Sequence, residues 1–73
     1  MNIAELLTTV AAALDVPAER VVEGTSADTL DEWDSLGHLQ VILAVEKQFG
    51  VRFRTDELAD LASIDALRGR LDV

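Results

Sequence analysis

Apolar residues recur every three or four positions near the start of the chain, which is the spacing of one face of an amphipathic helix. These residues are Ile3, Leu6, Leu7, Val10 and Leu14. Alanines, the strongest helix formers, fill most of the positions between them. Pro17 cannot continue a helix, because it lacks a backbone N–H and its φ angle is fixed. We therefore expect a helix over residues 3–14.

The strongest helical pattern covers residues 35–49, SLGHLQVILAVEKQF. Five side chains, most of them apolar, share one arc of this helix: Leu39, Ile42, Val45, Glu46 and Phe49. Gly50 follows them, and glycine readily adopts the left-handed conformation in which helices commonly end. We expect Phe49 and its apolar neighbours on this arc to lie in the core.

Two leucines fall away from the centre of that arc. With Ile42 at the centre and about 100° between successive residues, Leu36 and Leu43 lie at the edge of the apolar arc. We expect both to be exposed, beside Gln40 and Lys47. The simpler interpretation is that they are ordinary leucines at the edge of the core.

The last third of the chain predicts two further helices after a short extended link through Val51 and Phe53. Thr55 can cap a brief helix near residues 56–61, and Ser63 can cap another. Three apolar residues share one face of this last helix: Ile64, Leu67 and Leu71.

Residues 15–34 form a long loop that contains Pro17 and Gly24. Its isolated apolar residues should anchor it to the core: Val21, Val22, Leu30 and Trp33. Connections this long are uncommon in small domains and tend to be functional. The expected fold is all-α, a small bundle of three main helices plus one short helix without strand pairing, formed by residues 1–73 as a single domain.

Size and charge narrow the function. A domain of 73 residues buries only about 60% of its unfolded surface, which leaves little room for an enclosed active site beside a core. The formal net charge is −8, and residues 1–34 carry eight acidic residues against one basic residue. Such a charge repels nucleic acids and anionic membranes and favours basic patches on other proteins. A carrying or binding role is therefore favoured over catalysis.

Cysteine is absent, so any thiol chemistry must come from an added group. Residues 1–14 lack the features of a signal peptide, and no apolar run approaches the roughly 20 residues of a membrane span. We expect a cytoplasmic monomer that binds neither nucleic acid nor membrane.

Ser35 stands at the junction of the acidic loop and the central helix, where free backbone N–H groups and the helix dipole favour an anion. In the simplest interpretation, Asp34 or Ser35 is only a helix N-cap. A hydrolase with Ser35 as nucleophile, His38 as base and Asp31 or Asp34 as orienting group is disfavoured, because no strand-to-helix elbow or oxyanion-hole sequence is present. His38 is instead expected to be partly exposed.

A calcium loop that uses Asp28, Asp31 and Asp34 is also disfavoured. Leu30 occupies the third position counted from Asp28, where a calcium loop needs an oxygen ligand. The spacing of the acidic residues and of glycine therefore does not match that of a calcium-binding loop.

The segment from Asp34-Ser35-Leu36 through the helix to Val51 resembles the Asp-Ser-Leu motif and second helix of acyl carrier proteins. Further short segments fall where that family has counterparts: Leu14-Asp15-Val16, Glu19-Arg20-Val21 and Ala62-Ser63-Ile64. The resemblance implies that Ser35 receives covalent 4′-phosphopantetheine from coenzyme A through a separate magnesium-dependent phosphopantetheinyl transferase. Asp34 and Leu36 flank this serine and would help the transferase recognise it.

The resemblance further implies a carrier that is not an enzyme and that holds biosynthetic intermediates as thioesters. Its other partners would be acyl-loading and acyl-processing enzymes. They would dock on the helix of residues 35–49, at Leu36, Gln40, Leu43, Glu46 and Lys47.

Two departures from fatty acid carriers bear on the pathway. Where those carriers often have further acids, this helix has Gly37, Gln40, Lys47 and Gln48. Trp33 before the motif resembles a Trp-Asp-Ser-Leu variant of carriers in specialised pathways, although it equally fits an apolar staple at the helix start. Polyketide, hybrid peptide or related specialised metabolism is the preferred context. The alternatives are a carrier of fatty acid or aminoacyl groups, or a helical interaction module that carries nothing.

Overall fold

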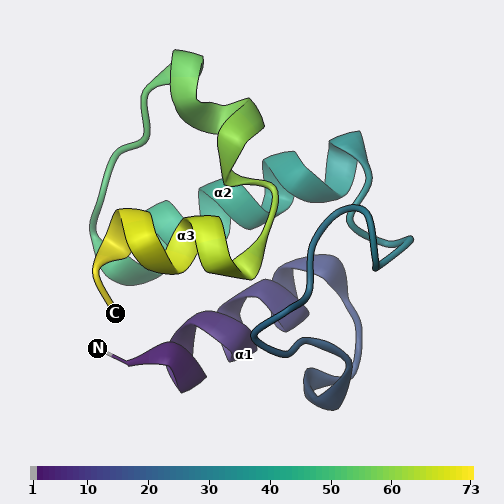
Figure 1. Ribbon diagram of the computed structural model, residues 1–73. Coiled ribbons are helices and arrows are strands. Elements are labelled where there is room, and N and C mark those ends of the chain that lie inside the picture. The colour runs from purple at the N-terminus through teal and green to yellow at the C-terminus, as the bar shows by residue number, and fades with distance from the viewer. Residues whose placement is uncertain (1) are drawn as a thin grey trace.

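Three α-helices and two short 3-10 helices follow one another in residues 2–73, the part of the chain that the computed structural model describes (Figure 1). In chain order they are α1 (Ile3–Leu14), η1 (Ala18–Arg20), α2 (Ser35–Phe49), η2 (Thr55–Leu61) and α3 (Ile64–Leu71). The all-α fold and the bounds of α1 and α2 confirm the prediction, whereas η1 was not predicted.

The start of α1 is fixed by Asn2, whose side chain accepts a hydrogen bond from Glu5 N at 3.1 Å. The helix ends at Asp15, which adopts the left-handed conformation with φ of 57°. Its buried face contributes Leu6, Val10, Ala11 and Leu14 to the core. Together with α2, this face forms the main helix–helix contact of the bundle.

The buried face of α2 is centred on Val45 rather than on Ile42. It comprises Gly37, Val41, Ile42, Val45 and Phe49. Leu39 is 51% exposed, so its predicted place in the core is wrong. The reason is the close approach of Gly37 to Leu14 of α1, which turns Val41 inward and Leu39 outward.

The long loop is anchored by three of the four predicted residues. Val21, Leu30 and Trp33 are buried, but Val22 is 55% exposed and does not reach the core. Val21 and Val22 cannot both face the core, because side chains of successive extended residues point in opposite directions.

Two backbone hydrogen bonds tie the loop to the start of α3. Ala27 N donates to Ala62 O at 3.0 Å, and Ile64 N donates to Thr25 O at 2.9 Å. They form an isolated antiparallel bridge between Ser26 and Ser63, so a minimal strand-like pairing occurs where none was expected.

The short helix begins one residue earlier than predicted. Thr55 is its first residue and Arg54 precedes it, so Thr55 is not the cap. Glu57 sets this boundary by accepting a hydrogen bond from Arg54 N at 2.7 Å. The cap of α3 is as predicted, because the hydroxyl of Ser63 accepts from Ala66 N at 3.0 Å. Of its predicted apolar face, Ile64 and Leu67 are buried and Leu71 is half-buried.

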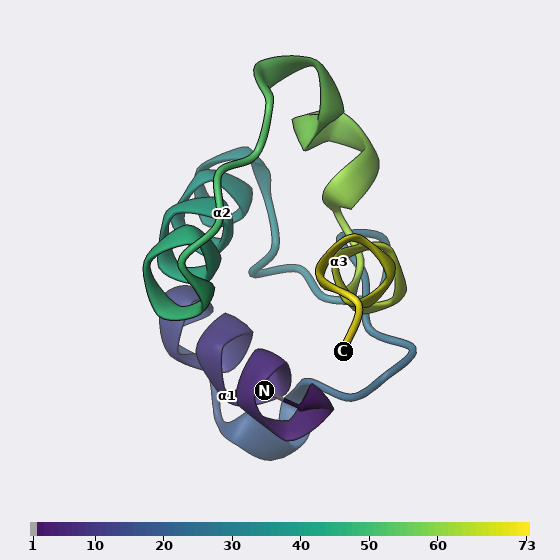
Figure 2. The same ribbon diagram turned by 90° about the vertical axis from the view of Figure 1, so that its left-hand side faces the viewer.

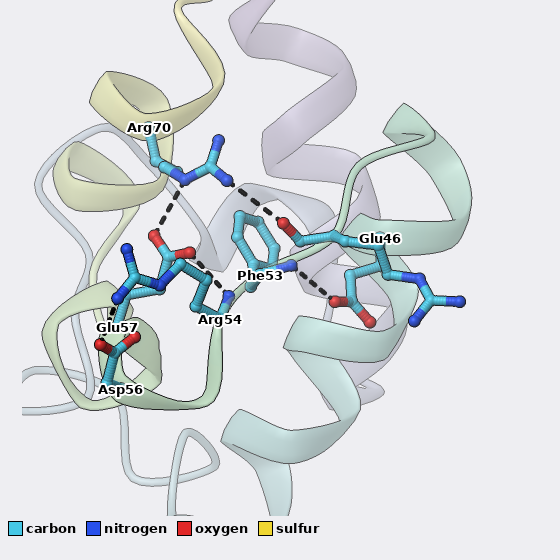
Figure 3. Close-up of polar contacts among 7 residues, drawn as sticks. Glu46, Phe53, Arg54, Asp56, Glu57 and Arg70 are labelled. Carbon is cyan, nitrogen blue, oxygen red and sulfur yellow. Dashed lines mark hydrogen bonds and ion pairs between the residues drawn. The ribbon is translucent and has the colours of Figure 1, made fainter.

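A polar network fastens the link between α2 and η2 to α3 (Figure 3). Phe53 N donates to the carboxylate of Glu46 at 2.8 Å. The guanidinium of Arg70 in α3 donates to Glu57 at 2.9 Å and to the backbone oxygen of Arg52 at 3.2 Å. Its carbon also lies 5.3 Å from the centroid of the Phe53 ring, in cation–π geometry.

The two chain ends lie together at one end of the bundle, and α2 begins at the other end (Figures 1 and 2). This follows from the antiparallel course of α1 and α2 and the return of α3 alongside them. In residues 2–73, no helix combines the length and hydropathy that a membrane crossing requires.

The network predicts a pH-dependent contribution of Glu57 to stability. The N–H of Arg54 and the guanidinium of Arg70 hold the pKa of Glu57 below its ordinary value of 4.5. Because the native carboxyl binds a proton less readily than the unfolded one, its stabilisation is complete above 4.5 and disappears as the pH falls through the lower native pKa. Glu57→Gln should therefore lower the melting temperature at pH 7, and this effect should shrink as the pH falls below 4.5.

Circular dichroism melts at low ionic strength measure this difference, because salt screens exposed ion pairs. Asp60→Asn is the matched control, since it removes a carboxylate from the same short helix outside the Glu57 contacts. A difference between wild type and Glu57→Gln that stays constant from pH 7 to pH 3 would contradict the prediction.

Candidate functional site

Ser35 is the first residue of α2, and its side chain is exposed. The residue before it, Asp34, is the N-cap, with its carboxylate accepting a hydrogen bond from Gly37 N at 2.7 Å. The sequence left the cap open between Asp34 and Ser35. Since Asp34 provides it, the Ser35 hydroxyl is not needed for capping and remains at the surface.

The first turn of α2 suits a negatively charged group. The N–H groups of its first residues have no carbonyl partner within the helix, and the dipole of this 15-residue helix is positive at that end. Asp34 uses the N–H of Gly37, and its backbone oxygen accepts from His38 N at 2.7 Å. The N–H groups of Ser35 and Leu36 precede these and lie next to the hydroxyl.

The loop is pressed against this turn at Gly37. A Cβ atom at this position would overlap the backbone oxygen of Glu32 and would lie 2.8 Å from the side chain of Leu14. Only glycine allows this contact. Arg20 reinforces it, because its guanidinium donates two hydrogen bonds to the Glu32 carboxylate at 2.7 and 3.1 Å. These bonds hold the pKa of Glu32 below its ordinary value.

His38 joins three segments at this junction. Trp33 Nε1 donates to its Nδ1 at 3.0 Å, and its Nε2 lies 2.7 Å from the backbone oxygen of Leu58 in η2. An indole N–H only donates and a carbonyl only accepts, so these partners assign the neutral ring with the proton on Nε2. Trp33 is 1% exposed, and an unpaired N–H at this depth would cost about 1–3 kcal/mol.

Trp33 and His38 occupy the two positions of a helix staple, immediately before the N-cap and four residues after it. Their ring centroids are 6.2 Å apart with planes inclined by 31°. The predicted staple role of Trp33 is therefore present, with a hydrogen bond added to the packing. His38 is half-buried, as expected of a partly exposed residue, but its two polar contacts were not foreseen.

The hydrolase alternative has no geometry to support it. Both ring nitrogens of His38 are bonded to groups other than Ser35, and the carboxylate of Asp34 is bonded to Gly37. Among residues 2–73, no cluster of three or more His, Cys, Asp or Glu residues could hold a metal ion. The calcium-loop alternative is therefore not supported within that range.

Three leucines form an exposed ridge along the solvent side of α2. Leu36, Leu39 and Leu43 are 66%, 51% and 57% exposed. By helical geometry, Leu36 lies about 180° from Val45, so it faces away from the core rather than at its edge. Gln40 and Lys47 are exposed on the same side. We call these five residues the α2 ridge.

Glu46 borders the α2 ridge and is half-buried. Its carboxylate accepts the Phe53 N–H and thereby holds the link that follows α2. Leu39 was not predicted as a member of the ridge, because the predicted core arc was centred on Ile42, about 60° around the helix from Val45.

The chain matches the family model described as "Phosphopantetheine attachment site" over residues 4–71. No curated protein matches the chain significantly. The family match extends from the first turn of α1 to the last residue of α3 and includes the whole junction around Ser35. The chain thus belongs to the phosphopantetheine-attachment family of acyl-carrier-type proteins, which carry covalent 4′-phosphopantetheine and are not themselves enzymes.

Proposed function

We propose that Ser35 is the residue that receives 4′-phosphopantetheine and that the chain presents biosynthetic intermediates on this group to partner enzymes. The observation that carries the proposal is an exposed serine hydroxyl, released from capping by Asp34, at the start of a 15-residue helix. It stands in an Asp-Ser-Leu motif inside the matched region.

The surroundings of Ser35 fit a phosphodiester. The free N–H groups and the dipole at the start of α2 favour the negative charge. When bound, the group supplies a terminal thiol that can hold an acyl group as a thioester. The chain has no cysteine, so it provides no competing thiol.

The attachment step is a phosphoryl transfer from coenzyme A. The Ser35 oxygen forms a bond to the phosphorus next to pantetheine while the pyrophosphate P–O bond breaks. Adenosine bisphosphate leaves, and the hydroxyl proton passes to a base of the transferase. Asp34 cannot readily act as that base while it caps Gly37, so its part is to hold the backbone on both sides of Ser35.

The α2 ridge is the proposed docking surface for the transferase and for acyl-loading and acyl-processing enzymes. It lies on the same helix as Ser35, presents apolar area beside polar side chains, and carries no acidic side chain. Glu46 borders it and adds one carboxylate, although this group also bonds to Phe53. The negative charge that attracts basic partners lies instead in the loop, where Asp28, Asp31 and Asp34 are exposed.

The pathway proposed for the carrier is polyketide, hybrid peptide or related specialised biosynthesis. Two features support it: the Trp33-Asp34-Ser35-Leu36 sequence, and an α2 surface with Gln40, Lys47 and Gln48 in place of further acids. The mass of the group loaded in the native host tests this assignment, and a plain fatty acyl or aminoacyl group would contradict it.

Treatment with a phosphopantetheinyl transferase, coenzyme A and magnesium should increase the mass of the intact protein by one phosphopantetheine. Ser35→Ala should abolish the increase, because it removes the acceptor oxygen. Ser26→Ala, which deletes an equivalent hydroxyl in the loop, should leave it intact. Modification of Ser35→Ala would show that the acceptor lies elsewhere, and no modification of wild type by several transferases would favour a non-carrier interaction module.

Leu36→Ala and Leu43→Ala should each raise the KM of the transferase or of a partner enzyme, because each removes apolar docking area beside Ser35. Their exposure predicts a loss of folding stability below about 1 kcal/mol. Val22→Ala is the matched control, since Val22 is 55% exposed but lies in the loop. Unchanged KM values for both leucine variants would place docking outside the α2 ridge.

A further inference from the structure

His38 is the single histidine of the chain, and neither its packing nor the attachment step accounts for its two hydrogen bonds. It lies one helical turn after Ser35, on the neighbouring face of α2. Its partners come from the loop before α2 and from η2, which is 20 residues further along the chain.

The bond to Trp33 constrains the residues just before Ser35. Trp33 is two positions before the serine, and its buried indole is fixed by packing and by His38 Nδ1. The adjacent Glu32 is fixed by Arg20 and by its contact with Gly37. The two residues that lead into the Asp34 cap, Glu32 and Trp33, are therefore each held by their own contacts.

The bond to Leu58 constrains η2. This short helix is tied to α3 at one end through Glu57 and Arg70. His38 supplies its polar tie to α2, through the backbone oxygen of Leu58. One imidazole thus contacts both the residues that lead into Ser35, through Trp33, and η2, through Leu58.

We propose that His38, as the neutral ring protonated on Nε2, is a positioning residue that holds Ser35 in the geometry that a transferase accepts. This inference rests on the proposed attachment at Ser35. Loss of the ring would let the junction sample other arrangements, and the apparent affinity of the transferase falls in proportion to the fraction that remains competent. We therefore expect loss of the ring to raise KM and to leave kcat at saturating carrier concentration unchanged.

Two substitutions separate the halves of the contact. His38→Asn keeps an acceptor oxygen near the position of Nδ1 for Trp33 but is too short to reach Leu58. His38→Gln keeps an N–H near the position of Nε2 for Leu58 but loses the acceptor for Trp33. His38→Ala loses both, and because alanine is the better helix former, its effect cannot come from helix propensity.

The experiment measures transferase kinetics on the full chain at a temperature where circular dichroism shows every variant folded. His38→Ala should raise KM about ten-fold, with His38→Asn and His38→Gln between it and wild type. Val10→Ala is the stability control, because Val10 is a fully buried core residue of α1 outside the junction. It should lower the melting temperature and leave KM unchanged.

Nitrogen NMR of the unmodified protein provides a readout that stability alone does not move. It should show the His38 proton on Nε2 and a Trp33 indole N–H protected from exchange, with that protection kept in His38→Asn and lost in His38→Gln. Equal KM values for wild type and His38→Ala, or a matching rise in Val10→Ala, would overturn the positioning role while leaving Ser35 as the acceptor. A wild type that no transferase modifies would overturn the proposed attachment itself.

Discussion

The contact between Gly37 and the backbone oxygen of Glu32 is the constraint on which the junction depends. Any side chain at position 37 would push the loop away from α2 and α2 away from Leu14 of α1. Trp33 and Asp34 are the next two residues after Glu32, so the buried indole and the helix cap lie immediately beside this contact. Gly37, which has no side chain, thus allows the close packing around Ser35, although it takes no part in the chemistry itself.

The residues that hold the junction around Ser35 differ from the residues of α2 that are exposed to a partner. Residues that fix the junction are buried or paired with one another, including Trp33, His38 and Glu32 with Arg20. Residues available to a partner, such as Leu36 and Leu43, project from the opposite side of the helix and contribute little to the core. A substitution on the exposed side of α2 can therefore leave the contacts around Ser35 undisturbed.

Sequence periodicity predicted the long elements well, because α1 and α2 have regular apolar spacing and are followed by the end signals Pro17 and Gly50. It failed where tertiary packing decides between neighbouring positions. Leu39 and Val22 were assigned to the core by local pattern, but the approach of Gly37 to α1 sets the rotation of α2, and of the two predicted valines of the loop only Val21 is buried.

The chemistry of the junction was only partly predictable. The motif and the position before a helix led to the proposal of Ser35 as the attachment residue, and the structure adds that Asp34 is the cap. The contact of His38 with Leu58 could not be found from sequence, because Leu58 lies 20 residues away and no local signal connects them. The network around Arg70 was missed for the same reason, since it links three separate elements.

The location of the two chain ends at one end of the bundle determines where a tag, a resin or a fused protein lies relative to Ser35. Both ends lie across the bundle from the start of α2, and α2 itself is roughly 22 Å long for its 15 residues. A resin, an affinity handle or a fused protein joined at either end would therefore stand at the pole remote from Ser35. Immobilised in that way, the molecule would keep its serine and the α2 ridge facing the solution.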